Sequence, residues 1–72
     1  MEVILRLREL REARGLSQRA LAKGIHVTPA AVAKWELGYT NPTMDNILAM
    51  ASFLGCSTDA LLGREVPGQN SA

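Results

Sequence analysis

Hydroxyl residues and glycines divide this chain into short segments. In three places an apolar residue precedes Ser or Thr, and a second apolar residue follows four positions later, around Ser17, Thr28 and Ser57. A looser version of the pattern surrounds Thr43. A hydroxyl at such a position caps a helix by accepting from a free backbone N–H, and the two apolar residues pack across the helix entry. The pattern therefore predicts four helix starts.

Glycines mark the predicted helix ends. A helix commonly ends at a left-handed residue, a conformation that glycine adopts without strain. The candidates are Gly15, Gly38, Gly55 and Gly63, with Gly24 as a fifth. Starts and ends together predict helices over residues 2–14, 18–24, 29–37, 44–54 and 58–62. No segment alternates apolar and polar residues as a strand would. We therefore expect an all-α protein, with one five-helix domain in residues 1–63 and a flexible tail over 64–72.

The apolar residues of these helices predict a single core, because they recur at three- and four-residue spacings. The expected core consists of Val3, Leu7, Leu10, Leu21, Ala22, Val32, Trp35, Ile47, Leu48, Ala51, Leu54, Leu61 and Leu62, with Ala13 or Arg14 continuing the first stripe. Ile4 and Leu5 give the first helix more apolar surface than one stripe requires. A dimer contact and a frayed helix end explain that excess equally well.

Composition excludes several functional classes. The 72 residues include one cysteine and one histidine, so there is no internal disulfide and no metal-ligand cluster. We expect no metal, no cofactor and a reducing, cytoplasmic setting. No apolar run is long enough to cross a membrane, and because charges come early we expect no signal peptide. A domain of this size is marginally stable alone, which makes dimerisation a reasonable expectation.

Charge is unevenly spread along the chain. Residues 1–38 hold seven Lys/Arg and four acids, whereas residues 39–72 hold one Arg and three acids. A basic half beside an acidic half permits nucleic-acid contact on one side. Charge alone still favours the simpler interpretation, a solvated surface of mixed charge.

The two middle helices are joined by about three residues, Ile25 to Val27. So short a link forces a sharp crossing rather than an antiparallel hairpin, and Ala22 is small where the helices would cross. This is helix-turn-helix geometry, in which the second helix can lie in the major groove of DNA.

Four fragments in this order, GLSQRALA, VTPAAVAKWELG, NPT and STDALLG, resemble the phage repressor and Cro-like helix-turn-helix domain, also called the xenobiotic-response-element type. The resemblance covers about residues 7–63. It implies a compact five-helix bundle of the lambda-repressor-like type and a transcriptional regulator, most simply a repressor. Such a regulator binds operator DNA as a homodimer in the bacterial or phage-infected cytoplasm, associated with the nucleoid.

The turn departs from the family pattern. His26 stands where the family usually has glycine, at a position that tends to need a positive φ. A left-handed non-glycine residue is strained, although histidine is among the better tolerated. Alternatively, the turn is shifted and Gly24 takes the strain. We expect His26 itself to be an exposed turn residue.

The resemblance also implies which residues contact DNA. Gln18 would reach a backbone phosphate, and Pro29, Ala30 and Lys34 match the base-reading positions. Val32 and Trp35 fix the core side of their helix, which leaves Thr28, Ala33 and Leu37 on the opposite side as well. The loop after this helix would supply phosphate contacts, although ordinary turn chemistry explains its residues equally well. The expected DNA-binding residues are Gln18, Thr28, Pro29, Ala30, Ala33, Lys34, Tyr39, Thr40 and Asn41.

The chemistry of the reading helix is sparse. Lys34 is its base-facing hydrogen-bond donor, suited to guanine or to a phosphate. Thr28 offers a hydroxyl to a phosphate when it is not occupied as a cap. Pro29 and Ala30 can only contact apolar groups such as a thymine methyl. We therefore expect specificity to come partly from DNA shape, or else to be low. Arg14 and Arg19 are further candidates for phosphate contacts, with plain solvation as the default.

Glu36 lies on the inner shoulder of the reading helix. The resemblance implies a pairing with Arg11, which would fix this helix against the first one. The alternative is an exposed, unpaired Glu36. Removing one partner of a buried pair is costly, because the other charge is left buried and uncompensated.

Two functional hypotheses follow. The first is a DNA-binding regulator, and the alternative is a protein-interaction module such as an antitoxin or adaptor that uses Ile4, Leu5 and Leu37. We expect no enzyme, since Ser57 and Asp59 have no histidine placed to activate the serine. Neither hypothesis includes a small-molecule ligand.

Overall fold

Five helices make up residues 6–63, the part of the chain that the structure, a computed structural model, describes. They are α1 (Leu7–Ala13), α2 (Gln18–Gly24), α3 (Pro29–Leu37), α4 (Met44–Leu54) and α5 (Thr58–Leu62). The ranges of α2 to α5 match those predicted, and the all-α fold class is confirmed. Among the described residues, no helix has the length and apolar character needed to cross a bilayer. The expected tail over 64–72 lies outside this part, as do Val3, Ile4 and Leu5.

The first helix is shorter than predicted. The described helix begins at Leu7 rather than residue 2, and Arg14 is already its C-terminal cap. The amide of Arg6 donates to the carbonyl of Leu61 at 2.8 Å, so it joins α1 to α5. Unlike the other four helices, α1 has no side chain that caps its start. Its start therefore had no signal in the sequence.

The hydroxyl caps are confirmed at all four predicted positions. Each side-chain oxygen accepts from the backbone N–H three residues further on, at distances between 3.0 and 3.2 Å. Losing such a cap typically costs about 1 kcal/mol. The capping residues are Ser17, Thr28, Thr43 and Ser57.

The left-handed helix ends are confirmed for four glycines and wrong for the fifth. Gly15, Gly38, Gly55 and Gly63 have φ between 67° and 80°. Gly24 instead lies within α2, where its missing Cβ leaves room for the ring of Phe53 from α4.

The core forms largely as predicted. Nine of the expected residues are buried: Leu7, Leu21, Ala22, Val32, Trp35, Ile47, Ala51, Leu54 and Leu61. Leu10 and Leu62 pack against them from partly exposed positions. Ile25 and Met50, which were not predicted, are also buried.

Two assignments to the core were wrong. Leu48 is 52% exposed, because the buried stripe of α4 runs through Ile47, Met50, Ala51 and Leu54, and Leu48 lies beside it. Ala13 and Arg14 are exposed, and the buried side chain at that end of α1 is Arg11. The polar partners of Arg11 explain how an arginine replaces an apolar residue there.

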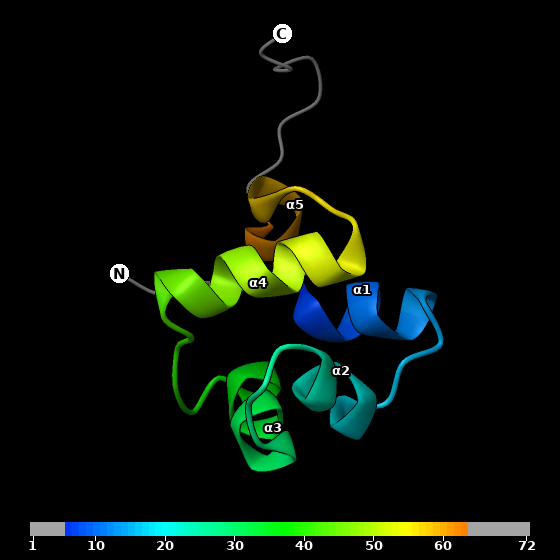
Figure 1. Cartoon of the computed structure of the whole chain (residues 1–72). Helices are drawn as coiled ribbons and strands as arrows, with labels where there is room; N and C mark the ends of the chain where they lie inside the picture. The colour runs from blue at the N-terminus through cyan, green and yellow to red at the C-terminus, as the bar shows by residue number, and fades with distance from the viewer. Residues whose placement is uncertain (1–5, 64–72) are drawn as a thin grey trace, which may run out of the picture.

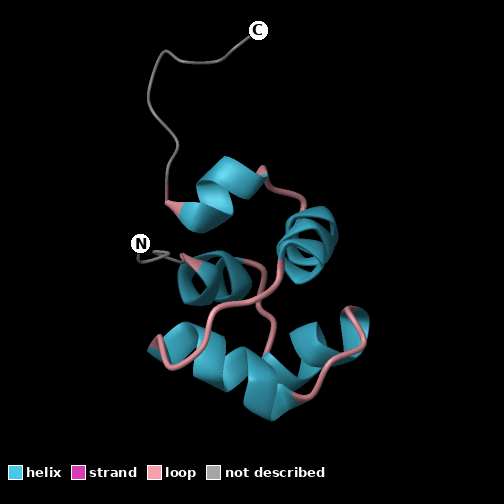
Figure 2. Ribbon diagram, turned by 90° about the vertical axis from the view of Figure 1, so that its left-hand side faces the viewer, coloured by secondary structure: helices cyan, strands magenta, loops and turns pink. Residues whose placement is uncertain are grey.

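The helices segregate into two parts. α2 packs on α3, while α4 and α1 pack on α5. Figures 1 and 2 show α2 and α3 together at the end of the molecule opposite α5, with α1 between. The α2–α3 pair therefore has an outer side that no other described helix covers.

Candidate nucleic-acid interface

A tight turn sets the angle between α2 and α3. The amide of His26 donates to the carbonyl of Lys23 at 3.4 Å, and the amide of Val27 donates to that of Ala22 at 2.9 Å. This bonding pattern ends a helix and requires a left-handed residue, which here is His26 with φ of 62°. Histidine therefore carries the strain itself, and the alternative in which Gly24 absorbs it was wrong.

The turn is also anchored on its inner side. Ala22 and Ile25, just before the turn, are both buried. Thr28 then begins α3 with a capping bond from Ala31, and Pro29 occupies the first turn, where its missing N–H has no consequence. α3 thus leaves the turn in one defined direction.

One side of α3 faces the core and the other faces outward. Val32 and Trp35 are buried, as the sequence predicted. Ala33 is half-buried at the edge of the outward side. The residues exposed on that side are Thr28, Pro29, Ala30, Lys34 and Leu37.

The hydroxyl of Thr28 caps α3 and still has a hydrogen to donate. Its hydroxyl oxygen accepts from the amide of Ala31 at 3.1 Å. A hydroxyl also has one proton to donate. Capping and a contact to a phosphate oxygen are therefore compatible and need not be alternatives.

The loop after α3 is tied to the end of that helix. Gly38 is left-handed, and the amide of Tyr39 donates to the carbonyl of Lys34 at 2.9 Å. Tyr39 is 75% exposed, and Thr40 and Asn41 are exposed beside it. Pro42 is buried and anchors the far end of the loop. The hydroxyl and amide groups of the loop are thus exposed directly after the end of α3.

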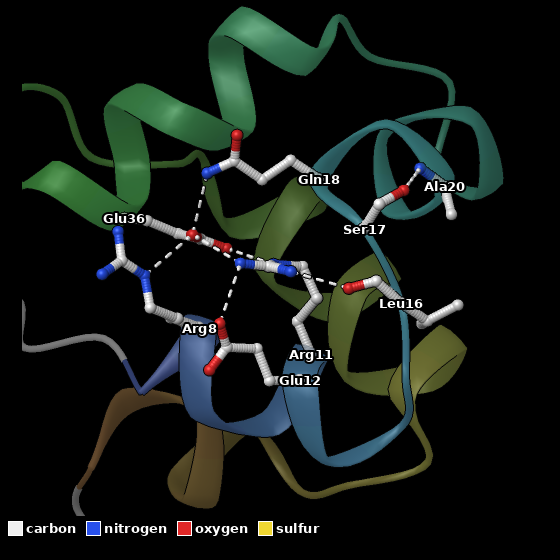
Figure 3. A network of polar contacts seen from close by, with 8 residues as sticks. All are labelled: Arg8, Arg11, Glu12, Leu16, Ser17, Gln18, Ala20 and Glu36. Carbon is white, nitrogen blue, oxygen red and sulfur yellow. Dashed lines mark hydrogen bonds and ion pairs between the residues drawn. The ribbon is translucent and has the colours of Figure 1, made fainter.

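A buried carboxylate joins α3 to α1 and α2. The Glu36 side chain is 0% exposed, and its Oε2 accepts from Arg11 Nε at 2.7 Å. Its Oε1 accepts from Arg11 Nη2 at 3.1 Å and from Gln18 Nε2 at 3.0 Å. The nitrogen Nε of Arg8 lies 3.4 Å from the same oxygen. Figure 3 shows these three side chains reaching the carboxylate from different sides. The pairing with Arg11 is confirmed, and the exposed alternative was wrong.

Arg11 also closes the link between α1 and α2. Its Nη1 donates to the carbonyl of Leu16 at 2.6 Å, while its own carbonyl accepts from the amide of Leu16 at 3.1 Å. Its side chain is 9% exposed, and Glu12 lies 3.9 Å from Nη2 at the surface. One guanidinium therefore holds the start of α2 and the end of α3 in a fixed relation.

The network favours the charged forms of both partners. Burial acts to raise the pKa of Glu36, but the hydrogen bonds from Arg11, Gln18 and Arg8 and the charge of Arg11 outweigh it, so this pKa lies below its ordinary value. The hydrogen bond to Glu36 raises the pKa of Arg11, against the opposing effect of burial. The ion pair is therefore maintained at neutral pH.

A match to a family model follows the same elements. The model described as helix-turn-helix matches residues 7–61, which run from the start of α1 into α5. The chain belongs to the helix-turn-helix family.

The relatives of this helix-turn-helix chain include named regulators. Repressor protein C2 of Salmonella phage P22 is 36% identical over 67 residues, covering 93% of this chain and 31% of the repressor. The transcriptional activator BcrR of Enterococcus faecalis is 34% identical over 65 residues, covering 90% of this chain and 32% of the activator. The chain thus spans about a third of the length of these relatives.

Solved structures share the helix-turn-helix fold. The P22 c2 repressor in complex with a synthetic operator aligns with a TM-score of 0.77 at 37% identity, covering 83% of this chain and 91% of that one. HppE, in a structure with cobalt(II) and substrate, aligns with a TM-score of 0.70 at 36% identity. That match covers 76% of this chain and 31% of HppE. The fold therefore recurs within a longer, substrate-binding protein.

The structure brings eight of the nine expected contact residues to the outward side of α3 and the loop that follows. The ninth, Gln18, is half-buried at the start of α2 and bonds to Glu36. Arg14 lies apart from them, because its guanidinium stands beside Gly55 at the end of α4. Arg19 is exposed on α2. Within residues 6–63 no group of three or more His, Cys, Asp or Glu is placed to hold a metal ion.

Sequence reasoning missed Arg8. Its guanidinium joins Glu36 beside Gln18, from a side chain that is 56% exposed. The available signal was its spacing of three from Arg11, which puts both arginines on one side of α1. That signal is weak without the position of α3, because four of the seven residues of α1 are charged.

Proposed function

We propose that this chain binds double-stranded DNA and regulates transcription, with α3 lying in the major groove. The observation that carries the proposal is the two-sided character of α3. Val32 and Trp35 anchor it in the core, while Thr28, Pro29, Ala30 and Lys34 are exposed. A helix held in this way at the end of a tight turn fits the groove of B-DNA. The operator complex of the P22 c2 repressor, a structural neighbour, supports the same geometry.

Each expected residue takes a role in this proposal. Lys34 donates to guanine or to a phosphate, and Pro29, Ala30 and Ala33 present apolar surface to thymine methyl groups. Thr28 and Gln18 donate to backbone phosphates, as do Tyr39, Thr40 and Asn41 from the loop. Backbone contacts fix the register of the protein on DNA without reading sequence. Because direct donors to bases are few, DNA shape contributes to specificity.

The finer parts of the proposal concern assembly and setting. The chain acts as a homodimer on a near-palindromic operator, in the cytoplasm of a bacterium, and represses the genes that the operator controls. Many regulators of this geometry bind two half-sites one helical turn apart. The names of its relatives include both a repressor and an activator.

Binding across a salt series tests the proposal. A duplex selected from a random-sequence library and a mixed-sequence duplex of equal length are titrated with the protein, and fluorescence anisotropy is measured. We expect tight binding to the selected duplex and a steep loss of affinity with salt, with log K falling about 0.9 per phosphate contact for each unit of log salt. A folded protein that binds neither duplex at low salt would refute the proposal.

A second candidate is a protein-interaction module, such as an antitoxin or adaptor. Leu37 is exposed at the end of α3, and Met44 and Leu48 are exposed one turn apart on α4. The likeness to a third of HppE supports it, since the bundle there belongs to a longer protein. Absence of salt-dependent DNA binding would favour this function over the first.

A further inference from the structure

Arg8 has a guanidinium that its protein partners use only in part. Its Nε lies 3.4 Å from Glu36 Oε1. Among residues 6–63 no partner is found for its two terminal nitrogens, and the side chain is 56% exposed. Arginine has five N–H donors in a fixed fork that matches a phosphate group. Four of these donors are therefore available to a ligand from outside.

Gln18 lies beside Arg8, because both side chains bond to Glu36 Oε1. Its Nε2 donates one hydrogen to Glu36 Oε1 at 3.0 Å and has a second to give. Figure 3 shows the amide oxygen of Gln18 pointing away from the carboxylate. Because Gln18 and Arg8 both lie within hydrogen-bond distance of one oxygen, a single phosphate group can reach both.

The two arginines of this group differ in what they bond to and in exposure. Glu36 carries one negative charge and accepts from both Arg8 and Arg11. Arg11 is buried, and its three nitrogens all donate to Glu36 or to the carbonyl of Leu16. Glu12 lies 3.9 Å from Arg11 Nη2, so two carboxylates balance the two arginines, and Arg8 is the arginine of this group whose side chain is exposed.

We propose that Arg8 and Gln18, held together on Glu36, form a clamp for one DNA backbone phosphate. The inference rests on the DNA-binding function proposed above and adds to it a contact from α1. Such a contact positions the protein on the duplex and reads no base, so it strengthens binding to every sequence alike.

Arg8→Gln tests whether the charge of Arg8 contributes to DNA binding. The selected duplex and the mixed-sequence duplex are titrated with each variant from low to high salt. We expect about a tenfold loss of affinity for both, as for one lost charge-assisted hydrogen bond. The slope of log K against log salt should fall by about 0.9, and the ratio of the two affinities should stay unchanged.

Arg6→Gln is the matched control. It removes the same charge from the start of α1, where Arg6 pairs with the exposed Glu9 at 3.2 Å. The backbone of Arg6 is bonded to α5, at the opposite end of the molecule from α2 and α3. We expect this variant to bind both duplexes as the unmodified protein does. An Arg8→Gln variant that behaves like Arg6→Gln would overturn the clamp.

Neutralising single phosphates tests whether the two residues share one. Each phosphate of the selected duplex is replaced in turn by a methylphosphonate, and Arg8→Gln and Gln18→Ala are compared with the unmodified protein. One replacement should abolish the effect of both substitutions, and the double variant should lose less affinity than the product of the single losses. Sensitivity to two different phosphates, or independent effects, would overturn the clamp.

The outcomes separate this inference from the function on which it rests. If the unmodified protein binds DNA but Arg8 is without effect, the clamp is wrong and the DNA-binding function stands. If the unmodified protein binds neither duplex, both are wrong. Circular dichroism of each variant at the titration temperature confirms that the fold is intact.

Discussion

In the proposed complex with DNA, direct reading of bases depends most on Lys34. It is exposed on α3 and is the only charged side chain on the outward side of that helix. Lys34→Ala should weaken binding to the selected duplex by about tenfold, since one hydrogen-bonding contact to a base contributes roughly 1–3 kcal/mol. The melting temperature should change little, because the side chain is exposed. Anisotropy and thermal unfolding measure the two effects, with Arg6→Ala as a control for charge. Unchanged affinity would remove Lys34 from the interface.

Glu36 makes the fold sensitive to acid. Its folded-state pKa lies below the ordinary value of 4.5, so ionised Glu36 contributes stability that is present above pH 4.5 and is lost as the pH falls through the lowered value. Glu36→Gln should reduce the free energy of unfolding at pH 7 by about 3–5 kcal/mol, because it leaves the charge of Arg11 buried. Below pH 4.5 the difference between the two proteins should shrink.

Urea unfolding between pH 3 and pH 7 measures this dependence at low temperature. The matched control is Glu9→Gln, which breaks only the exposed pair with Arg6 and should change stability by less than about 1 kcal/mol. If the free energies of unfolding of the unmodified protein and Glu36→Gln changed in parallel with pH, the buried pair would not be the source of the acid sensitivity.

At the scale of elements, the turn between α2 and α3 stores strain at one residue. His26 has φ of 62°, a conformation that costs a non-glycine residue roughly 1–2 kcal/mol. His26→Gly should raise the free energy of unfolding by about 1 kcal/mol, part of the gain being offset by the greater freedom of glycine in the unfolded chain. His26→Val should lower it, because a β-branched residue tolerates this region least. Urea unfolding of the three proteins checks the order, and a less stable glycine variant would contradict it.

The ends of the elements were predictable where local chemistry sets them. Capping hydroxyls and left-handed glycines act within one turn of backbone, so the bounds of α2 to α5 followed from sequence. α1 has no capping side chain, and its first amide bonds to α5 instead. Its start therefore depends on a tertiary contact that no local pattern reports. Leu48 was assigned wrongly for a related reason, since the helices that pack on α4, α5 among them, decide which side of it is buried.

The candidate site was predictable to the same degree. The outward row of α3 followed from the spacing of Val32 and Trp35, which are buried. The pairing of Glu36 with Arg11 came from family resemblance, because the two residues lie 25 positions apart. The shared bonds of Arg8 and Gln18 to Glu36 required three helices in their final positions. Contacts between distant segments were thus the part that sequence reasoning could not reach.

At the scale of the whole molecule, two chains should bind one operator. Each chain should contribute one α3, with the centres of the two helices about 34 Å apart on one side of the duplex. Footprinting of the selected duplex should show two half-sites about 10 base pairs apart, and sedimentation should give two chains per duplex. A saturated complex with one chain and a single protected half-site would contradict the dimer.

The central claim is that the outward side of α3 meets DNA. The most direct measurement is the change in backbone amide chemical shifts when the ¹⁵N-labelled protein is titrated with the selected duplex. The account predicts that the largest changes fall between residues 28 and 34, with further changes in the loop at residues 39 to 41 and around Gln18. Changes confined to α4 and α5, with the amides of α3 unmoved, would contradict it.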